Sequence, residues 1–134
     1  MRVKDFMTTI LVTADVDTPV VEAARLMAAE EVGSLIVTRG DEMVGIVTQR
    51  DIIEAQLMSS EFYEKLTVGD IMATQVVSIS PDADLWQAIA LMDQTGKKHI
   101  PVVSGNETIG VISATDLIRV LATMKIIAEG AEED

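Results

Sequence analysis

Two short motifs combine a hydroxyl group with a carboxylate. The stretch "GIVTQRDII" at residues 45–53 contains Thr48 and Asp51, and "GVISATDLI" at residues 110–118 contains Ser113 and Asp116. A hydroxyl followed three residues later by an acid at the start of a helix is a capping box, which stabilises the helix by about 1 kcal/mol. The same groups can instead bind a ligand, because a helix N-terminus attracts phosphate and a carboxylate accepts both hydroxyls of a ribose. Both interpretations stay open at this point.

The other reactive residue types limit the chemistry that the chain can perform. The sequence has no cysteine and one histidine, His99, which excludes disulfides, thiolate nucleophiles and metal sites with two imidazoles. It contains no phosphate-binding loop, no G-x-G-x-x-G motif and no nucleophilic triad. We therefore expect that the protein is not an enzyme. We expect no required cofactor, although acidic surface residues could hold Mg²⁺ beside a bound phosphate.

The net charge and the hydropathy of the chain argue against nucleic acid and membranes as partners. Its 134 residues include 10 Lys and Arg against 22 Asp and Glu, a net charge of −12. Such a chain repels a phosphate backbone, so we expect no binding to nucleic acid. No apolar run approaches the roughly 18–20 residues of a membrane-spanning helix, and the first residues lack a signal-peptide core. We expect a cytoplasmic protein that does not associate with a membrane.

The chain is an internal repeat. Residues 3–53 align with residues 68–118 without a gap, so that "VKDFM" meets "VGDIM" and "GDEMVGIV" meets "GNETIGVI". An internal repeat determines the architecture of a small protein. One copy of about 50 residues would be marginally stable alone, because so small a unit buries too little apolar surface. We therefore expect the two copies to pack against each other with pseudo-two-fold symmetry.

Each copy is predicted to contain the same elements in the same order. A short helix precedes a brief strand, which we expect at residues 10–13 and at residues 76–79. A longer helix follows, with Thr18 as N-cap and Pro19 in its first turn in one copy, and with Gly96 at its C-terminal end in the other. Two strands then flank a tight turn, at "RGDE" or "GNE", and a last helix closes the copy.

This pattern resembles a tandem cystathionine-beta-synthase (CBS) domain pair, or Bateman module, over residues 3 to about 122. The resemblance rests on the "DxM" segments, the helix after "DTPV", and strand pairs that end in a glycine, two apolar residues, a hydroxyl residue and an aspartate. It implies an α+β fold with two copies of a β-α-β-β-α unit. We expect CBS domain 1 at residues 1–58, a linker at 59–67, CBS domain 2 at 68–128 and an acidic tail at 129–134. Because no catalytic domain is attached, we expect a stand-alone regulatory module.

The resemblance implies a ligand-binding function without chemistry of its own. CBS pairs sense adenosyl nucleotides such as AMP, ADP, ATP or S-adenosylmethionine in clefts between the two copies. By this resemblance Asp51 and Asp116 hold ribose, and Thr48 and Ser113 face phosphate or sugar. Each pocket would combine residues of both copies. The first pocket would contain Ile46, Val47, Thr48, Arg50, Asp51, Ser80, Ala83, Ala88, Lys98, His99 and Ile100. The second would contain Thr18, Ala23, Gly33, Ser34, Leu35, Val111, Ile112, Ser113, Thr115 and Asp116.

The two predicted pockets differ in charge. Arg50, Lys98 and His99 belong to the first pocket, and Lys97 is adjacent in the sequence, whereas the second pocket contains only hydroxyl, small and apolar residues besides its aspartate. Charge-assisted hydrogen bonds to phosphate are stronger than neutral ones. We therefore expect a phosphate group in the pocket of Asp51.

The main alternative is a ligand-free dimerisation or interaction scaffold, in which both motifs serve only as helix caps. Under either interpretation the resemblance implies a homodimer. It also implies a regulated protein on another chain, which the sequence does not identify.

Overall fold

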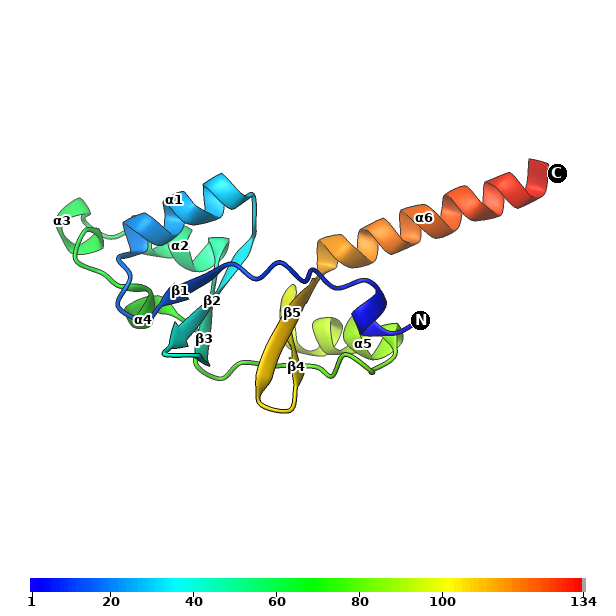
Figure 1. Ribbon diagram of the computed structural model, residues 1–134. Coiled ribbons are helices and arrows are strands. Elements are labelled where there is room, and N and C mark those ends of the chain that lie inside the picture. Colours follow the sequence, from blue (N-terminus) through cyan, green and yellow to red (C-terminus); the bar gives the residue numbers. More distant parts are fainter. Residues whose placement is uncertain (134) are drawn as a thin grey trace. The chain divides into compact units, whose positions relative to one another are not determined.

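A computed structural model describes the backbone of residues 1–133 and the side chains of residues 1–130. The chain divides into two compact units (Figure 1). One unit is Ile10–Val77, and the other joins Met1–Thr9 to Ser78–Asp134. Each unit places helices beside a small sheet, so the predicted α+β fold with a repeated unit is confirmed.

The unit Ile10–Val77 is built on a three-stranded sheet. Its strand order is β1 (Thr13–Asp15), β2 (Ser34–Arg39) and β3 (Glu42–Thr48), with β1 and β2 parallel and β2 and β3 antiparallel. A parallel pair needs a crossover connection, which α1 provides. The antiparallel register sets Ser34 opposite Thr48, at the end of β3 where the next helix begins. The helices are α1 (Val20–Glu30), α2 (Gln49–Gln56), α3 (Ser60–Tyr63) and α4 (Val68–Ile71).

The second unit is built on a β-hairpin. Strands β4 (His99–Ser104) and β5 (Glu107–Ser113) pair antiparallel, with His99 opposite Ser113. Its helices are the 3₁₀ helix η1 (Val3–Asp5), α5 (Leu85–Thr95) and α6 (Ala114–Glu133). Figure 1 shows α6 extending from the end of β5 and away from the rest of its unit, and residues 121–130 are all exposed. The predicted acidic tail at 129–134 therefore falls on the last turns of α6, apart from residue 134, which lies outside the described residues.

The short N-terminal segment of each repeat copy does not pack with its own copy. It packs in the compact unit that contains the rest of the other copy. In the unit Ile10–Val77, Ala73 and Ile46 exchange backbone hydrogen bonds of 2.9 and 3.1 Å. In the second unit, Thr8 and Val111 exchange equivalent bonds of 2.9 and 3.0 Å. The segment of residues 1–9 thus packs with the second repeat copy, and α4 packs with the first. The predicted boundaries at 1–58 and 68–128 describe the sequence repeats rather than these compact units.

Each unit has its own hydrophobic core, formed by the apolar faces of its helices and sheet. In the unit Ile10–Val77 the core contains Ala14, Val20, Ala23, Met27, Leu35, Val37, Val47, Ile52, Ala55 and Val68. In the second unit it contains Val3, Leu85, Ala88, Ile100, Val102, Ile112 and Val120. Among the described residues, no helix combines the length and the apolar character that crossing a membrane would require.

Two predicted features differ from the structure. The first strand covers Thr13–Asp15 rather than residues 10–13, and residues 76–79 contribute only an isolated parallel bridge between Ile79 and Val102. The predicted Thr18 cap is wrong, because α1 begins at Val20 with Pro19 at the N-cap. The N–H of Val20 donates to the carbonyl of Leu66 at 2.9 Å, so backbone from the segment before α4 replaces a side-chain cap. The predicted end of α5 at Gly96 is confirmed by its left-handed φ of 69°.

Candidate functional site

Asp51 lies in the first turn of α2 and forms a capping box with Thr48. Its Oδ2 accepts hydrogen bonds from the backbone N–H of Thr48 at 2.9 Å and from its hydroxyl at 3.1 Å. The hydroxyl in turn accepts a bond of 3.4 Å from the backbone N–H of Asp51. Within the described part of the chain, Oδ1 of Asp51 has no hydrogen-bond or ion-pair partner. Because Asp51 is only half-buried, this oxygen is accessible to a solute.

Asp116 forms the same capping box with Ser113 and has two further partners. Its Oδ2 accepts from the backbone N–H of Ser113 at 2.8 Å and from its hydroxyl at 3.0 Å. Its Oδ1 accepts a hydrogen bond of 3.4 Å from Thr8 and lies 3.7 Å from Nη1 of Arg119. Asp116 is 6% exposed and is the one buried polar residue of the described chain. Both of its oxygens are therefore engaged.

A third capping box shows that this arrangement alone does not identify a ligand site. Thr67 and Asp70 at the start of α4 form it with bonds of 2.9 and 3.1 Å, outside the repeated motif. A capping box stabilises a helix start wherever it occurs. In each motif, helix capping therefore explains the hydroxyl group and one of the two carboxylate oxygens. Any ligand function has to rest on the other oxygen and on the surroundings.

The structure brings Gly33 and Ser34 to the start of α2. The N–H of Gln49 donates to the carbonyl of Gly33 at 3.1 Å, and Ser34 pairs with Thr48 across the sheet. Arg50, whose side chain is 87% exposed, forms an ion pair of 3.1 Å with Glu54 on α2. Thr18 lies just before α1. The predicted apolar residues of this unit are buried: Ala23, Leu35, Ile46 and Val47.

The equivalent positions in the second unit carry positive charge. Ala114, the first residue of α6, donates its N–H to the carbonyl of Lys98 at 2.9 Å, and His99 pairs with Ser113. Lys97 and Lys98 are exposed and His99 is half-buried. In the aligned repeat, Lys98 and His99 stand where the first copy has Gly33 and Ser34. The start of α6 is therefore more basic than the start of α2.

The remaining predicted residues of the second unit divide into core and surface. The hydroxyl of Ser80 accepts the N–H of Asp82 at 3.2 Å, and the N–H of Val3 donates to the carbonyl of Ala83 at 2.9 Å. Thr115 is exposed and Val111 is half-buried. The residues that pack in the core are Ala88, Ile100 and Ile112, so the structure favours a packing role for their side chains. Each predicted pocket joins residues of both units, and that combination stays a prediction.

Comparison with known proteins identifies the family of the chain. The model of the CBS domain family matches residues 3–58 and again residues 68–123. The chain belongs to the CBS domain family. It is 34% identical to the CBS domain-containing protein YhcV of Bacillus subtilis, over 86% of this chain and 81% of YhcV. It is 30% identical to the mitochondrial CBS domain-containing protein CBSX3 of Arabidopsis thaliana over 77% of this chain, but the match spans only 52% of CBSX3.

A solved structure of a related CBS protein contains a nucleotide. CBSX2 in complex with AMP is 25% identical to this chain and superposes with a TM-score of 0.79, covering 92% of this chain and 98% of CBSX2. The expected CBS domain pair is therefore confirmed as the fold of this chain.

The surroundings of His99 alter its pKa. Burial lowers the pKa of His99 below 6.5, because desolvation disfavours the imidazolium, and Lys98 lowers it further. The carboxylate of Asp116 opposes this shift without cancelling it. His99 is therefore mainly neutral at pH 7, and the permanent positive charge near the start of α6 comes from Lys97, Lys98 and Arg119.

Sequence reasoning missed two residues that contact Asp116, namely Thr8 and Arg119. In the aligned repeat these positions are Ala73 and Glu54 in the other copy. The two positions differ between the copies, Thr8 and Ala73 within the aligned range and Arg119 and Glu54 one residue beyond it. These differences became interpretable only when the structure showed that the segment containing Thr8 packs against the second copy. Among the described residues, no group of three His, Cys, Asp or Glu side chains could hold a metal ion.

Proposed function

We propose that this CBS pair is a regulatory module that binds an adenosyl nucleotide, with Asp51 as the ribose-binding residue. The observation that carries the proposal is Oδ1 of Asp51 at the start of α2, which has no partner among the described residues. A carboxylate oxygen in this position can accept ribose hydroxyls while the other oxygen keeps the helix capped. The AMP bound to the related CBSX2 supports a nucleotide as the ligand.

The surroundings of Asp51 suit the sugar and base of such a ligand. Ile46 and Val47 precede Thr48 at the end of β3, and because Val47 is fully buried and Ile46 is 7% exposed, a flat base would contact this strand end through Ile46 and the backbone. The N-terminal N–H groups of α2 favour an anion. Arg50, on α2 itself, supplies a positive charge for a phosphate in a chain whose net charge is −12. This assignment favours AMP, ADP or ATP over the cationic S-adenosylmethionine, and Mg²⁺ is an optional companion of ATP.

The proposed module acts by changing the balance between conformations that a homodimer mate or another protein recognises. A ligand shifts such an equilibrium only by as much as it binds one conformation more tightly than the other. No catalytic step is part of this proposal.

Isothermal titration calorimetry with AMP, ATP and S-adenosylmethionine tests the proposal. We expect saturable binding by the wild type and a loss of at least about tenfold in affinity for Asp51→Ala, since a charge-assisted hydrogen bond contributes roughly 1.5–3 kcal/mol. Asp70→Ala is the matched control, because it removes the same two hydrogen bonds between an aspartate and a threonine at a helix start outside the motif. Equal affinities for the two variants would show that Asp51 is only a cap.

The second candidate function is a dimerisation scaffold without a ligand. The capping box of Thr67 and Asp70 favours it, because a threonine and an aspartate form the same cap at a helix start outside the repeated motif. The scaffold predicts no binding of the three nucleotides by the wild type, together with a dimeric mass in sedimentation equilibrium.

A further inference from the structure

We propose that the carboxylates of Asp51 and Asp116 differ in their accessibility to a ligand. This CBS pair binds one adenosyl ligand through Asp51, whereas Thr8 and Arg119 contact the carboxylate of Asp116 and prevent a ligand from binding there. This inference rests on the proposed nucleotide-binding function and assigns a selectivity role to residues outside the repeated motif.

The first observation is that both carboxylate oxygens of Asp116 have partners and that the side chain is buried. Oδ2 is held by the backbone and hydroxyl of Ser113 at 2.8 and 3.0 Å, as in any capping box. Oδ1 accepts the hydroxyl of Thr8 at 3.4 Å and faces Arg119 at 3.7 Å. The side chain of Asp116 is only 7% exposed. A ribose can reach this carboxylate only by displacing both Thr8 and Arg119.

The second observation is that Asp51 has neither of these partners. Ala73 stands where the other copy has Thr8, and its methyl group cannot donate a hydrogen bond. Glu54 stands where the other copy has Arg119, and it pairs with Arg50 instead of the aspartate. The two differences act in the same direction, since each removes a contact to Oδ1.

The third observation is that the backbone is equivalent at the two places. Thr8 exchanges two backbone hydrogen bonds with Val111, and Ala73 exchanges two with Ile46, at the aligned position. The segment therefore brings the residue at this position to the same place beside each motif. The difference between an open and a closed carboxylate follows from the side chains alone, which makes it exchangeable by mutation.

Reciprocal substitutions test the inference by calorimetric titration with AMP. We expect the wild type to bind one AMP per chain. Ala73→Thr supplies a hydroxyl beside Asp51 and is expected to weaken binding by at least about tenfold. The matched control is Ala73→Val, which has a similar shape without the hydroxyl, and it is expected to bind more tightly than Ala73→Thr. Thr8→Ala combined with Arg119→Ala is expected to raise the stoichiometry from one AMP to two.

The side-chain carboxyl ¹³C chemical shifts of the two aspartates test the contact without a ligand. We expect Thr8→Ala to move the resonance of Asp116 and Ala73→Thr to move that of Asp51. A wild type with two equal sites, and with equal binding by Ala73→Thr and Ala73→Val, would overturn the inference while leaving nucleotide binding intact. A wild type that binds none of the nucleotides would overturn the proposed function and the selectivity role with it. The chemical shifts would then decide only whether Thr8 contacts Asp116.

Discussion

Gly45 lies directly beneath Met72, so closely that a Cβ atom at Gly45 would stand 2.5 Å from the sulfur of Met72 and 2.8 Å from the carbonyl oxygen of Ala73. The second unit repeats this packing, because a Cβ atom at Gly110 would stand 2.7 Å from the sulfur of Met7. Real Cβ atoms do not approach other atoms this closely. Each glycine therefore permits a short N-terminal segment to lie against the strand that leads into the motif.

Gly45→Ala is expected to destabilise the protein by about 1–3 kcal/mol. The carbonyl oxygen of Ala73 cannot move away from the new methyl group without disturbing its hydrogen bond from the N–H of Ile46 in β3. Urea unfolding followed by circular dichroism measures this change. Gly130→Ala is the control, since nothing lies within 4 Å of a Cβ there and the residue is in α6. Alanine at position 130 is expected to be neutral or stabilising. Equal stability of wild type and Gly45→Ala would refute the close packing.

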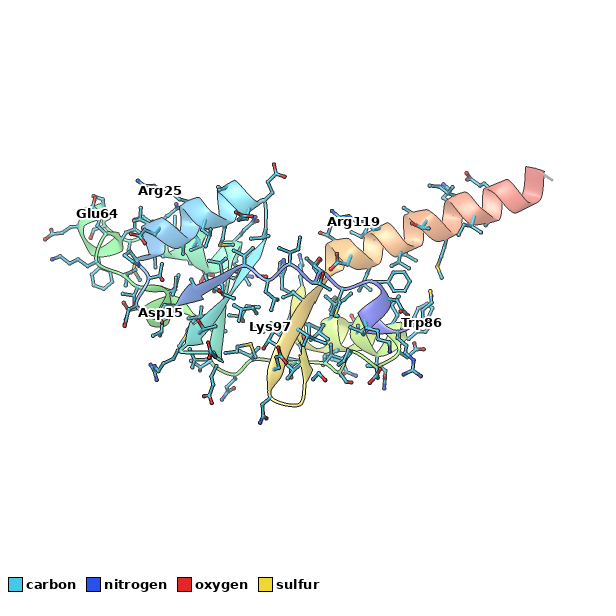
Figure 2. All side chains as sticks on the ribbon, viewed as in Figure 1. Asp15, Arg25, Glu64, Trp86, Lys97 and Arg119 are labelled. Carbon is cyan, nitrogen blue, oxygen red and sulfur yellow. The ribbon has the colours of Figure 1, made fainter. Side chains whose placement is uncertain are left out.

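Asp84→Ala is expected to cost about 1 kcal/mol of stability through loss of a helix cap. Oδ1 of Asp84 accepts the N–H of Trp86 at 2.8 Å, and Gln87 accepts the N–H of Asp84 at 2.8 Å, so both halves of the cap are formed. Asp93→Ala removes the same charge from an exposed position inside α5 and should leave the unfolding midpoint nearly unchanged. Trp86 is the only tryptophan, is 66% exposed and is labelled beside α5 in Figure 2, so its fluorescence reports on this helix.

His99 is expected to make the protein less stable as the pH falls below 6.5. Its pKa in the folded protein is lowered by burial, so below 6.5 the unfolded chain takes up the proton more readily than the folded one. The stabilising contribution is complete above 6.5 and is lost as the pH falls toward the lowered value. Urea unfolding about one pH unit on either side of 6.5 measures it. His99→Gln should show a smaller loss of stability than the wild type, and an identical loss would contradict the role of His99.

The two halves of α6 are expected to respond differently to truncation of a side chain. Val120 is 7% exposed in its unit's core, whereas Ile127 is 66% exposed. Val120→Ala should destabilise the protein by roughly 1–2 kcal/mol. Ile127→Ala should change the free energy of unfolding by less than about 0.5 kcal/mol, as is usual for surface positions. Thermal unfolding at low protein concentration compares the two variants, and a large effect at Ile127 would mean that α6 packs on something beyond its own unit.

The repeat and the local signals in the sequence predicted much of the fold. Glycines in the hairpin turns, Gly40 and Gly105, have left-handed φ values of 64° and 61°, and both hairpins form as expected. The Thr48–Asp51 and Ser113–Asp116 caps also form. These features depend on residues close together in the sequence, which is why a single sequence reveals them.

The features that sequence analysis missed depend on contacts between distant residues. Nothing within "VKDFM" indicates which strand pair it packs against, so the pairing of Thr8 with Val111 was not foreseen. The cap of α1 was misplaced because the carbonyl of Leu66, far along the chain, satisfies the N–H of Val20. The hydrogen bond from Thr8 to Asp116 also joins residues that are far apart in the sequence. The candidate carboxylates were predictable, but their different accessibility was not.

The exchange of N-terminal segments sets an order of events during synthesis. Ile10–Val77 is one uninterrupted stretch, so all of its contacts are available once residue 77 has left the ribosome. Residues 1–9 precede this stretch, but their partners all follow it, from Pro81 and Ala83 to Val111 and Asp116. The segment of residues 1–9 therefore completes its contacts later than the unit that follows it in the sequence, and a chain that stops before β5 would lack the strand that pairs with Thr8.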